Sequence, residues 1–254
     1  STLMKHLSLP SPATSRIPTL RCLLCLGLLL LLVPLAAEAQ RKKVGVVLSG
    51  GGAKGVAHIG VLQVLEKAGI PVDVIVGTSM GSIVGGLYAI GYSADQLDSL
   101  VRVQDWMFLL SDKVNRYDLP FGEKEQDGKY LLSLPFDRGK KRPSGFISGQ
   151  NVYNLFSDLT VGYHDSLDFL QLPIPFACVA ADLFHREEIV MTSGNLVQAM
   201  RASMAIPGVF TPVRTDNRVL VDGGILNNFP TDVARRLGAE RAMKSSSGST
   251  PRPI

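Results

Sequence analysis

Hydrophobic residues follow two patterns along this chain. Short continuous runs rich in β-branched residues predict buried strands; they cover residues 44–48, 72–76, 175–182 and 218–221, with 187–191 as the expected partner of the third run. Longer segments carry apolar residues at helical spacing; they cover residues 56–68, 79–90, 93–100, 148–160, 195–203 and 230–237. Strands that alternate with helices through short connections favour an α/β fold with a mostly parallel sheet.

Two segments lack this periodicity. Residues 105–142 hold aromatic side chains among many charges, and two interpretations stay open: a lid beside a pocket, or a solvated connector. Residues 241–254 are polar and rich in Ser, so they are expected to form a disordered or non-native tail. The helix that ends at Gly238 should be followed by a strand in an α/β fold, and the pattern predicts none. The folded domain is therefore expected to span residues 44–240, in a chain that is truncated or joined to an unrelated tail.

Residues 1–39 have the organisation of a secretory signal peptide, with Met4 as the expected start. Basic residues precede a leucine-rich run at 22–35, and the small residues of 37–39 supply a cleavage site. An uncleaved membrane anchor is the alternative, but the run is shorter than the roughly 20 residues that span a bilayer. Residues 40–43 then form a basic linker. We expect export followed by cleavage.

Composition limits the function classes. The chain has 254 residues, of which 46% are hydrophobic, enough for one domain with its own core. Residues before 40 carry a net charge of +2 and residues after 240 carry +3, so the segment between them carries −1 of the total of +4. That segment has no basic stripe interleaved with aromatic residues, which argues against nucleic acid as a partner. Cys22 and Cys25 lie in the leucine-rich run and Cys178 in a predicted buried strand, so no disulfide or metal-ligand spacing remains.

Three glycine-rich turns each follow a predicted strand: SGGGAKG at 49–55, GTSMG at 77–81 and DGG at 222–224. Open α/β sheets place their sites outside the carboxyl ends of the strands, so we expect all three turns to project to that edge. The middle turn has the G-x-S-x-G spacing of a nucleophile elbow, in which Gly77 and Gly81 remove Cβ atoms that would clash in a sharp turn. Ser79 is therefore the candidate nucleophile.

A serine nucleophile needs a base, and the histidines are poorly placed for that role. The usual Ser-His-Asp hydrolase on such a fold carries its histidine late in the chain, and none follows Asp222. A carboxylate can act as the base itself where its surroundings raise its pKa or hold it against the hydroxyl. Asp222 ends a predicted strand, and Gly223 and Gly224 allow a close backbone approach. We predict a Ser79–Asp222 dyad, with a triad through His58 as the alternative.

The first glycine turn is the candidate oxyanion hole. Gly50, Gly51 and Gly52 offer backbone N–H groups at a predicted helix N-terminus, whose dipole favours negative charge. The turn also matches the G-x-G-x-x-G dinucleotide fingerprint, but the second strand ends in Gly-Thr-Ser where that site needs an acidic residue. Lys54 comes too early for a P-loop. We therefore expect no nucleotide, no metal and no other cofactor.

The three turns in this order, with Ala202-Ser203 and Pro207, resemble the patatin-like phospholipases over residues 43–240. The resemblance implies a three-layer α/β/α fold with a mostly parallel central sheet, and a Ser–Asp dyad that hydrolyses acyl esters of lipids. It assigns the nucleophile, the base and the oxyanion hole to the residues named above, and it gives Lys54 a role in ordering the glycine turn or in contacting the lipid phosphate. With its signal peptide, the chain resembles exported bacterial members, some of which continue into a membrane β-barrel.

These expectations describe an exported serine acyl hydrolase, in the bacterial envelope or secreted. It would cleave phospholipid or lysophospholipid esters at a membrane surface through an acyl-enzyme. Two alternatives stay open. One is an exported lipid-binding module without turnover, and the other is a carboxylesterase for short esters.

Overall fold

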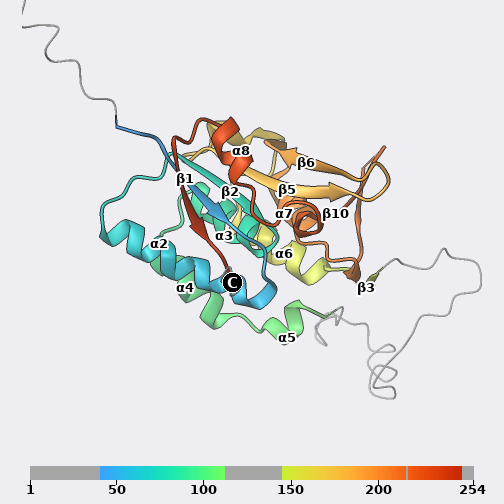
Figure 1. Cartoon of the computed structure of the whole chain (residues 1–254). Coiled ribbons are helices and arrows are strands. Elements are labelled where there is room, and N and C mark those ends of the chain that lie inside the picture. The colour runs from blue at the N-terminus through green and yellow to red at the C-terminus, as the bar shows by residue number, and fades with distance from the viewer. Residues whose placement is uncertain (1–40, 112–144, 216, 248–254) are drawn as a thin grey trace, which may run out of the picture. The chain divides into compact units, whose positions relative to one another are not determined.

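The structure, a computed structural model, describes residues 41–111, 145–215 and 217–247 (Figure 1). The predicted signal peptide and most of the irregular segment 105–142 lie outside these residues, so both interpretations of that segment stay predictions. Within the described ranges, no helix is both long and apolar enough to cross a membrane.

In the described residues, a seven-stranded mixed sheet forms the centre of the domain. Its order is β11-β1-β2-β5-β10-β9, and β6 pairs with β5. Strands β11, β1, β2 and β5 are parallel, whereas β10 and β6 run antiparallel to β5. Their bounds are β1 Val44–Leu48, β2 Val74–Thr78, β5 Phe176–Asp182, β6 Glu187–Met191, β9 Val213–Arg214, β10 Val219–Asp222 and β11 Arg241–Ser245. Two small sheets pair β3 Gly145–Ile147 with β8 Gly208–Phe210 and β4 Leu167–Asp168 with β7 Ser193–Gly194.

Alternation along the central strands divides the core between two faces of the sheet. Val46 and Phe176 pack into a large cluster with the helices α2 to α7, while Val47 and Val76 pack with Val233 of α8 on the other face. The sheet therefore lies between two helical layers, as the predicted three-layer fold requires, and these layers can be followed in Figure 1. The helices are α2 Ala57–Lys67, α3 Met80–Ala89, α4 Ala94–Val103, α5 Trp106–Leu109, α6 Gln150–Leu159, α7 Leu196–Ser203 and α8 Thr231–Arg236, with 3-10 turns η2 Gly52–Val56, η3 Phe169–Gln171 and η4 Gly223–Ile225.

Local sequence signals place several elements correctly. The predicted first strand agrees with β1. Ser93 caps α4, and its side chain and that of Gln96 form the reciprocal bonds of a capping box. The second strand begins two residues later than predicted and runs on through Gly77 and Thr78, because both residues pair with β5.

The prediction of a disordered or non-native tail is wrong for its first residues. Residues 241–245 form β11, which pairs in parallel with β1 from Val44↔Arg241 to Leu48↔Ser245. An edge strand gains its hydrogen bonds from the neighbouring backbone and buries few side chains, so a sequence such as RAMKS carries no periodic signal. The strand that an α/β fold needs after Gly238 is therefore present. The rest of the predicted tail, residues 248–254, lies outside the described residues.

Candidate active site

Strand β5 brings the two candidate dyad residues together along one of its edges. Its first four residues pair with β2, ending at Val179↔Thr78, and its last three pair with β10, ending at Ala180↔Asp222. Strand β6 pairs with residues of both parts and so occupies the opposite edge. Strands β2 and β10 therefore run toward each other along the same edge of β5. Their carboxyl ends meet between Val179 and Ala180.

This arrangement corrects part of the prediction from the sequence. We expected all three glycine-rich turns to project to the edge at the carboxyl ends of the strands in a mostly parallel sheet, but β10 is antiparallel to β5. The DGG turn nevertheless reaches the site because β5 extends three residues beyond the end of β2, and β10 descends along that extension. Sequence periodicity identifies strands without giving their direction, so it could not distinguish the two cases.

Ser79 occupies the sharp turn between β2 and α3. Its φ is 53° and its ψ is −124°, and it is one of two described non-glycine residues with positive φ. Such a backbone costs about 1–3 kcal/mol and persists only where the surroundings impose it. The turn also depends on glycine, because a Cβ on Gly81 would lie 2.2 Å from the Leu48 carbonyl oxygen and one on Gly77 would lie 2.4 Å from the Gly81 oxygen. The predicted elbow geometry is therefore present.

The side chains of Ser79 and Asp222 form a buried pair. Ser79 Oγ donates a hydrogen bond to Asp222 Oδ2 at 2.5 Å, and the two residues are only 5% and 6% exposed. The other carboxylate oxygen accepts the Gly224 N–H at 2.7 Å. Burial raises the pKa of the Asp222 carboxyl above its ordinary value, against the hydrogen bonds from Ser79 and Gly224, which lower it. A carboxylate with a raised pKa, held against a hydroxyl, is arranged to accept that hydroxyl's proton.

The DGG turn packs tightly enough to explain its glycines. A Cβ on Gly223 would lie 2.3 Å from the Val179 carbonyl oxygen, and one on Gly224 would lie 3.0 Å from Asp222 Oδ1. The turn thus lies directly against β5, the strand with which Asp222 pairs. Any side chain at Gly223 would push the carboxylate away from Ser79.

The glycine turn at 50–52 lies beside Ser79, and its three N–H groups differ. A Cβ on Gly50 would lie 3.0 Å from Ser79 Cβ, so the turn touches the serine side chain. The Gly50 N–H donates to Asn228 Oδ1 at 3.0 Å. The N–H groups of Gly51 and Gly52 meet no acceptor in the described part of the chain. Only the last two are therefore ready to receive an anion as the structure stands.

Residues of the supposed tail hold this glycine turn in place. Ser247 Oγ donates to the Gly50 carbonyl at 2.8 Å, and the Ser49 N–H donates to the Ser245 carbonyl at 3.1 Å. Ser245 Oγ also bonds His58 Nδ1 at 2.6 Å. These contacts join β11 to the candidate oxyanion hole. These contacts could not be predicted from the sequence, because the polar residues after 240 show no periodic pattern.

His58 is bonded away from Ser79. Its Nε2 lies 2.8 Å from the Ser49 carbonyl, which can only accept, so Nε2 carries the hydrogen and Nδ1 accepts from Ser245. The residue is fully buried, and burial lowers the pKa of the imidazole. Both ring nitrogens have partners other than Ser79, so the geometry gives the alternative triad no support. Lys54 lies in η2 with an exposed side chain, consistent with contact to a ligand from outside.

Two supporting residues escaped sequence reasoning. Ser203, at the end of α7, accepts the Ser79 N–H on its hydroxyl at 2.9 Å. Asn228 bonds Gly50 as described above, from the loop that follows the DGG turn. Ser203 stood in the segment that carried the family resemblance, but no spacing in the sequence connects it with Ser79.

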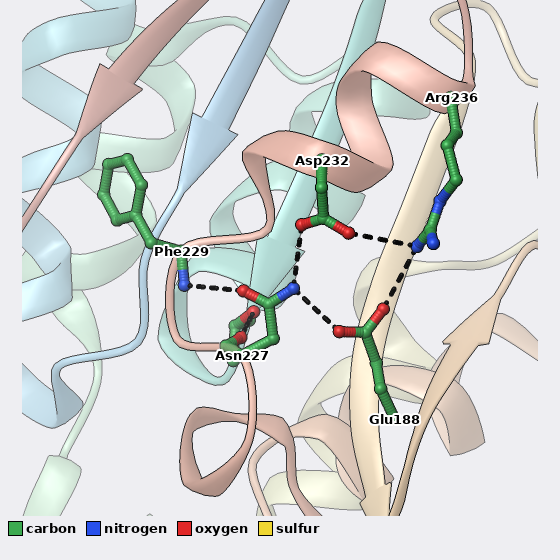
Figure 2. A network of polar contacts seen from close by, with 6 residues as sticks. Glu188, Asn227, Phe229, Asp232 and Arg236 are labelled. Carbon is green, nitrogen blue, oxygen red and sulfur yellow. Dashed lines mark hydrogen bonds and ion pairs between the residues drawn. The ribbon is translucent and has the colours of Figure 1, made fainter.

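Two hollows of the described surface are lined by residues other than Ser79 and Asp222. The larger, about 550 Å³, is lined by β6 and α8 residues, including Glu188, Asp232 and Arg236. Figure 2 shows these charges already engaged: Asn227 Nδ2 donates to Glu188 at 2.7 Å and to Asp232 at 3.0 Å, and Arg236 bridges both carboxylates at 3.2 Å. The Asn227 carbonyl accepts Thr78 Oγ1 at 3.0 Å. The network therefore connects the loop after the DGG turn to β2, the strand that ends directly before Ser79.

One group of metal-ligating side chains occurs in the described residues. Ligand atoms of Asp182, His185 and Glu187, at the β5–β6 hairpin, lie within 4.8 Å of one another. His185 Nδ1 bonds Asp182 at 2.6 Å, and Arg218 pairs with Glu187 at 2.9 Å. The three side chains thus have protein partners. The fold brings the three together at one hairpin, a closeness that we did not recognise in the sequence.

Known proteins resemble this chain in sequence. A family model described as patatin-like phospholipase matches residues 46–235. Patatin-like phospholipase domain-containing protein ZK370.4 of Caenorhabditis elegans is 35% identical over 208 residues, and protein 6 of the same description from Homo sapiens is 32% identical over 217 residues. These alignments cover 81% and 85% of this chain but 14% of each relative. The chain therefore spans about a seventh of their length.

Bacterial proteins are also similar. An uncharacterized NTE family protein of Mycobacterium tuberculosis is 32% identical over 199 residues, which is 78% of this chain and 29% of that protein. Among solved structures, VipD from Legionella pneumophila superimposes with a TM-score of 0.47 at 19% identity, covering 74% of this chain and 46% of that one. The family model matches most of the chain, and this match shows that the chain belongs to the patatin-like phospholipase family.

Proposed function

We propose that this domain is a serine acyl hydrolase that cleaves the ester bonds of phospholipids or lysophospholipids, with Ser79 as nucleophile and Asp222 as base. The observation that carries the proposal is the 2.5 Å hydrogen bond from Ser79 Oγ to Asp222 Oδ2 in a buried site. It supplies a nucleophile and a proton acceptor in contact, which is what covalent acyl transfer requires.

In the first half of the reaction, Ser79 Oγ attacks the ester carbonyl carbon while its proton passes to Asp222 Oδ2. The raised pKa of Asp222 favours this transfer. The negative charge moves to the carbonyl oxygen, where the N–H groups of Gly51 and Gly52 can stabilise it. When the tetrahedral intermediate collapses, the C–O bond to the lipid alcohol breaks and Asp222 returns the proton to the leaving oxygen. An acyl-enzyme on Ser79 remains.

In the second half, a water molecule attacks the acyl carbonyl and gives its proton to Asp222. The same two N–H groups stabilise the second oxyanion. Collapse releases the fatty acid, and Asp222 returns the proton to Ser79 Oγ. No net change remains on the protein.

The lipid nature of the substrate is supported by apolar side chains near the pair. Ile225 and Leu226 follow the DGG turn directly and are 56% and 49% exposed. The carbonyl of Ala205 accepts the Asp222 N–H. Ile206 and Val209 follow Ala205 and are 38% and 41% exposed. These residues belong to two segments, one directly after Asp222 and the other directly after Ala205, and their exposed apolar side chains favour an apolar ligand. We propose that both segments meet a lipid surface, and that the signal peptide delivers the domain there.

Two substitutions test the chemistry. Ser79→Ala and Asp222→Asn should each abolish hydrolysis of phospholipid vesicles, and Ser79→Ala should abolish labelling by a fluorophosphonate probe. Ser99→Ala and Asp158→Asn, which change exposed residues of the same types, are the matched controls. Wild-type hydrolysis rates in both site variants would refute the proposal.

A substrate series separates the two alternatives. A lipid hydrolase should prefer phospholipid or lysophospholipid over p-nitrophenyl esters of short acids, and its rate should rise with acyl length. A short-chain carboxylesterase should show the reverse. A lipid-binding module without turnover should bind vesicles and leave the probe unreacted.

A further inference from the structure

A buried hydroxyl links the backbone of Ser79 to the strand beside it. Ser203 is 0% exposed, and its Oγ accepts the Ser79 N–H at 2.9 Å while donating to the Val179 carbonyl at 2.6 Å. Val179 is the residue of β5 that pairs with Thr78, immediately before Ser79 leaves the ladder. The Ser203 hydroxyl therefore continues the connection between β2 and β5 at the point where the backbone turns away.

The same short segment also holds the base. The Asp222 N–H donates to the Ala205 carbonyl at 2.9 Å, two residues after Ser203. One end of α7 thus bonds the backbone of both members of the pair: a side-chain hydroxyl holds Ser79, and a main-chain carbonyl holds Asp222. Ala180, which pairs with Asp222, is the next residue of β5 after Val179. All of these contacts surround the point where β2 and β10 meet.

We propose that Ser203 is a positioning residue for the reaction, which fixes the strained turn at Ser79 so that its Oγ stays against Asp222. This inference rests on the proposed function. It gives a role to the Ala202-Ser203 segment, which the chemistry above does not use. Ser203 touches neither substrate nor the reacting atoms, and it acts through the Ser79 backbone.

The physical reason lies in the φ of 53° at Ser79. A residue other than glycine keeps such a backbone only where neighbouring groups impose it. Removing the Ser203 hydroxyl leaves the Ser79 N–H and the Val179 carbonyl without this partner in a buried place, and the turn relaxes to satisfy them. A relaxed turn moves Oγ away from Asp222, and misplacement by about 1 Å lowers rates by roughly 100-fold.

The test compares Ser203→Ala with Ser203→Thr, which keeps the hydroxyl. The measurements are the second-order rate constant for fluorophosphonate labelling of Ser79, and kcat and KM with a p-nitrophenyl ester, at a temperature where circular dichroism shows each variant folded. We expect Ser203→Ala to lower the labelling rate and kcat by about 10- to 100-fold with KM unchanged. Ser203→Thr should stay within about fivefold of the wild type.

Thr160→Val is the matched control, because it removes another fully buried hydroxyl, whose acceptor is the Phe156 carbonyl. Its labelling rate should stay within about twofold of the wild type. The inference would be overturned if the probe labelled Ser203→Ala at the wild-type rate, or if Ser203→Ala changed only KM. It would also be overturned if Thr160→Val lowered the labelling rate as much as Ser203→Ala does. If Ser203→Ala does not fold, Ser203→Cys replaces it: a sulfur accepts hydrogen bonds weakly, so slower labelling than Ser203→Thr supports the inference and equal rates overturn it.

Failure of the inference and failure of the proposed function give different results. A wild-type protein that the probe does not label would refute the proposed function. A wild-type protein that is labelled, with Ser203→Ala labelled equally fast, would refute only the role of Ser203.

Discussion

Two buried aspartates lie where β5 and β10 pair, and they are alike in burial and in the types of hydrogen bond that they accept. The pKa of one carboxyl group is nevertheless raised, and the pKa of the other is lowered. Asp222 and Asp182 are 6% and 1% exposed, and each accepts the backbone N–H two residues further on, from Gly224 at 2.7 Å and Phe184 at 3.0 Å. The second oxygen of each bonds a side chain, Ser79 Oγ at 2.5 Å or His185 Nδ1 at 2.6 Å.

The hydrogen-bond partners of the two carboxyl groups explain why their pKa values differ. Burial raises the pKa of Asp222, and the bonds from a neutral hydroxyl and one backbone N–H do not reverse that effect. Burial also acts to raise the pKa of Asp182, but hydrogen bonds from His185 and from the backbone of Phe184 and His185, with the attraction of the imidazole, lower it below its ordinary value. His185 is half exposed, so the Asp182 site is also close to solvent. Burial in a tight turn is therefore not enough to make an aspartate a base. The side chain bonded to its second carboxylate oxygen determines whether its pKa is raised or lowered.

The largest expected difference between the two is in activity. Asp222→Asn should reduce kcat for ester hydrolysis by at least about 10³-fold, because no group remains to take the Ser79 proton. Asp182→Asn should leave kcat within about fivefold, because Asp182 touches neither Ser79 nor the glycine turn. Steady-state hydrolysis of one lipid by both variants measures this. A large loss of kcat in Asp182→Asn would show that the two aspartates do not differ in their importance for catalysis.

The pH dependence of catalysis should follow Asp222 alone. The base must be ionised, so kcat/KM should rise with pH through an apparent pKa above the ordinary value of aspartate and then stay level. Asp182→Asn should leave this profile unchanged. A profile that is flat down to the ordinary aspartate range would contradict the raised pKa of Asp222.

Stability should respond to the two changes with opposite signs. A group whose pKa is raised on folding binds its proton more tightly in the folded state, so stability falls as pH rises from the unfolded pKa through the folded one. Asp222→Asn removes this cost and should raise the melting temperature at pH 7. Asp182 has a lowered pKa, so its stabilising effect is present above the unfolded pKa and is lost as pH falls through the folded one. Asp182→Asn should lower the melting temperature at pH 7, and melts of both variants across pH test the two signs.

The smallest expected effect concerns metal. The proposed chemistry uses a hydroxyl, a carboxylate and backbone N–H groups, so treatment with EDTA should change kcat by less than about twofold. Adding Zn²⁺ to the EDTA-treated protein, with His185→Asn as control, checks whether the Asp182–His185–Glu187 group influences the site. Restoration of lost activity by Zn²⁺ would mean that the hairpin takes part in function.

Much of the site could be predicted because its chemistry is local. The elbow at Ser79 and the DGG turn at Asp222 depend on glycines that remove nearby Cβ atoms, and such requirements are visible in a short stretch of sequence. The boundary of α4 was equally local, since Ser93 and Gln96 form its capping box.

The parts that were missed depend on pairing between distant residues. Ser245 gains its place by bonding to β1 and His58, and nothing in its neighbours indicates a strand. The direction of β10 follows from the overhang of β5, which no run of apolar residues records. Ser203 is one serine among many until the fold brings it to the Ser79 N–H.

The end-to-end meeting of β2 and β10 on β5 has a consequence for how this site can change. A strand can shift along its neighbour only by whole residues, roughly 3.3 Å each, and a shift of one also turns every side chain to the opposite face. The distance between serine and aspartate is therefore quantised rather than adjustable. Loops between positions 79 and 222 can change in length without altering this distance. A slip of β10 against β5 by one residue, in contrast, separates Ser79 from Asp222.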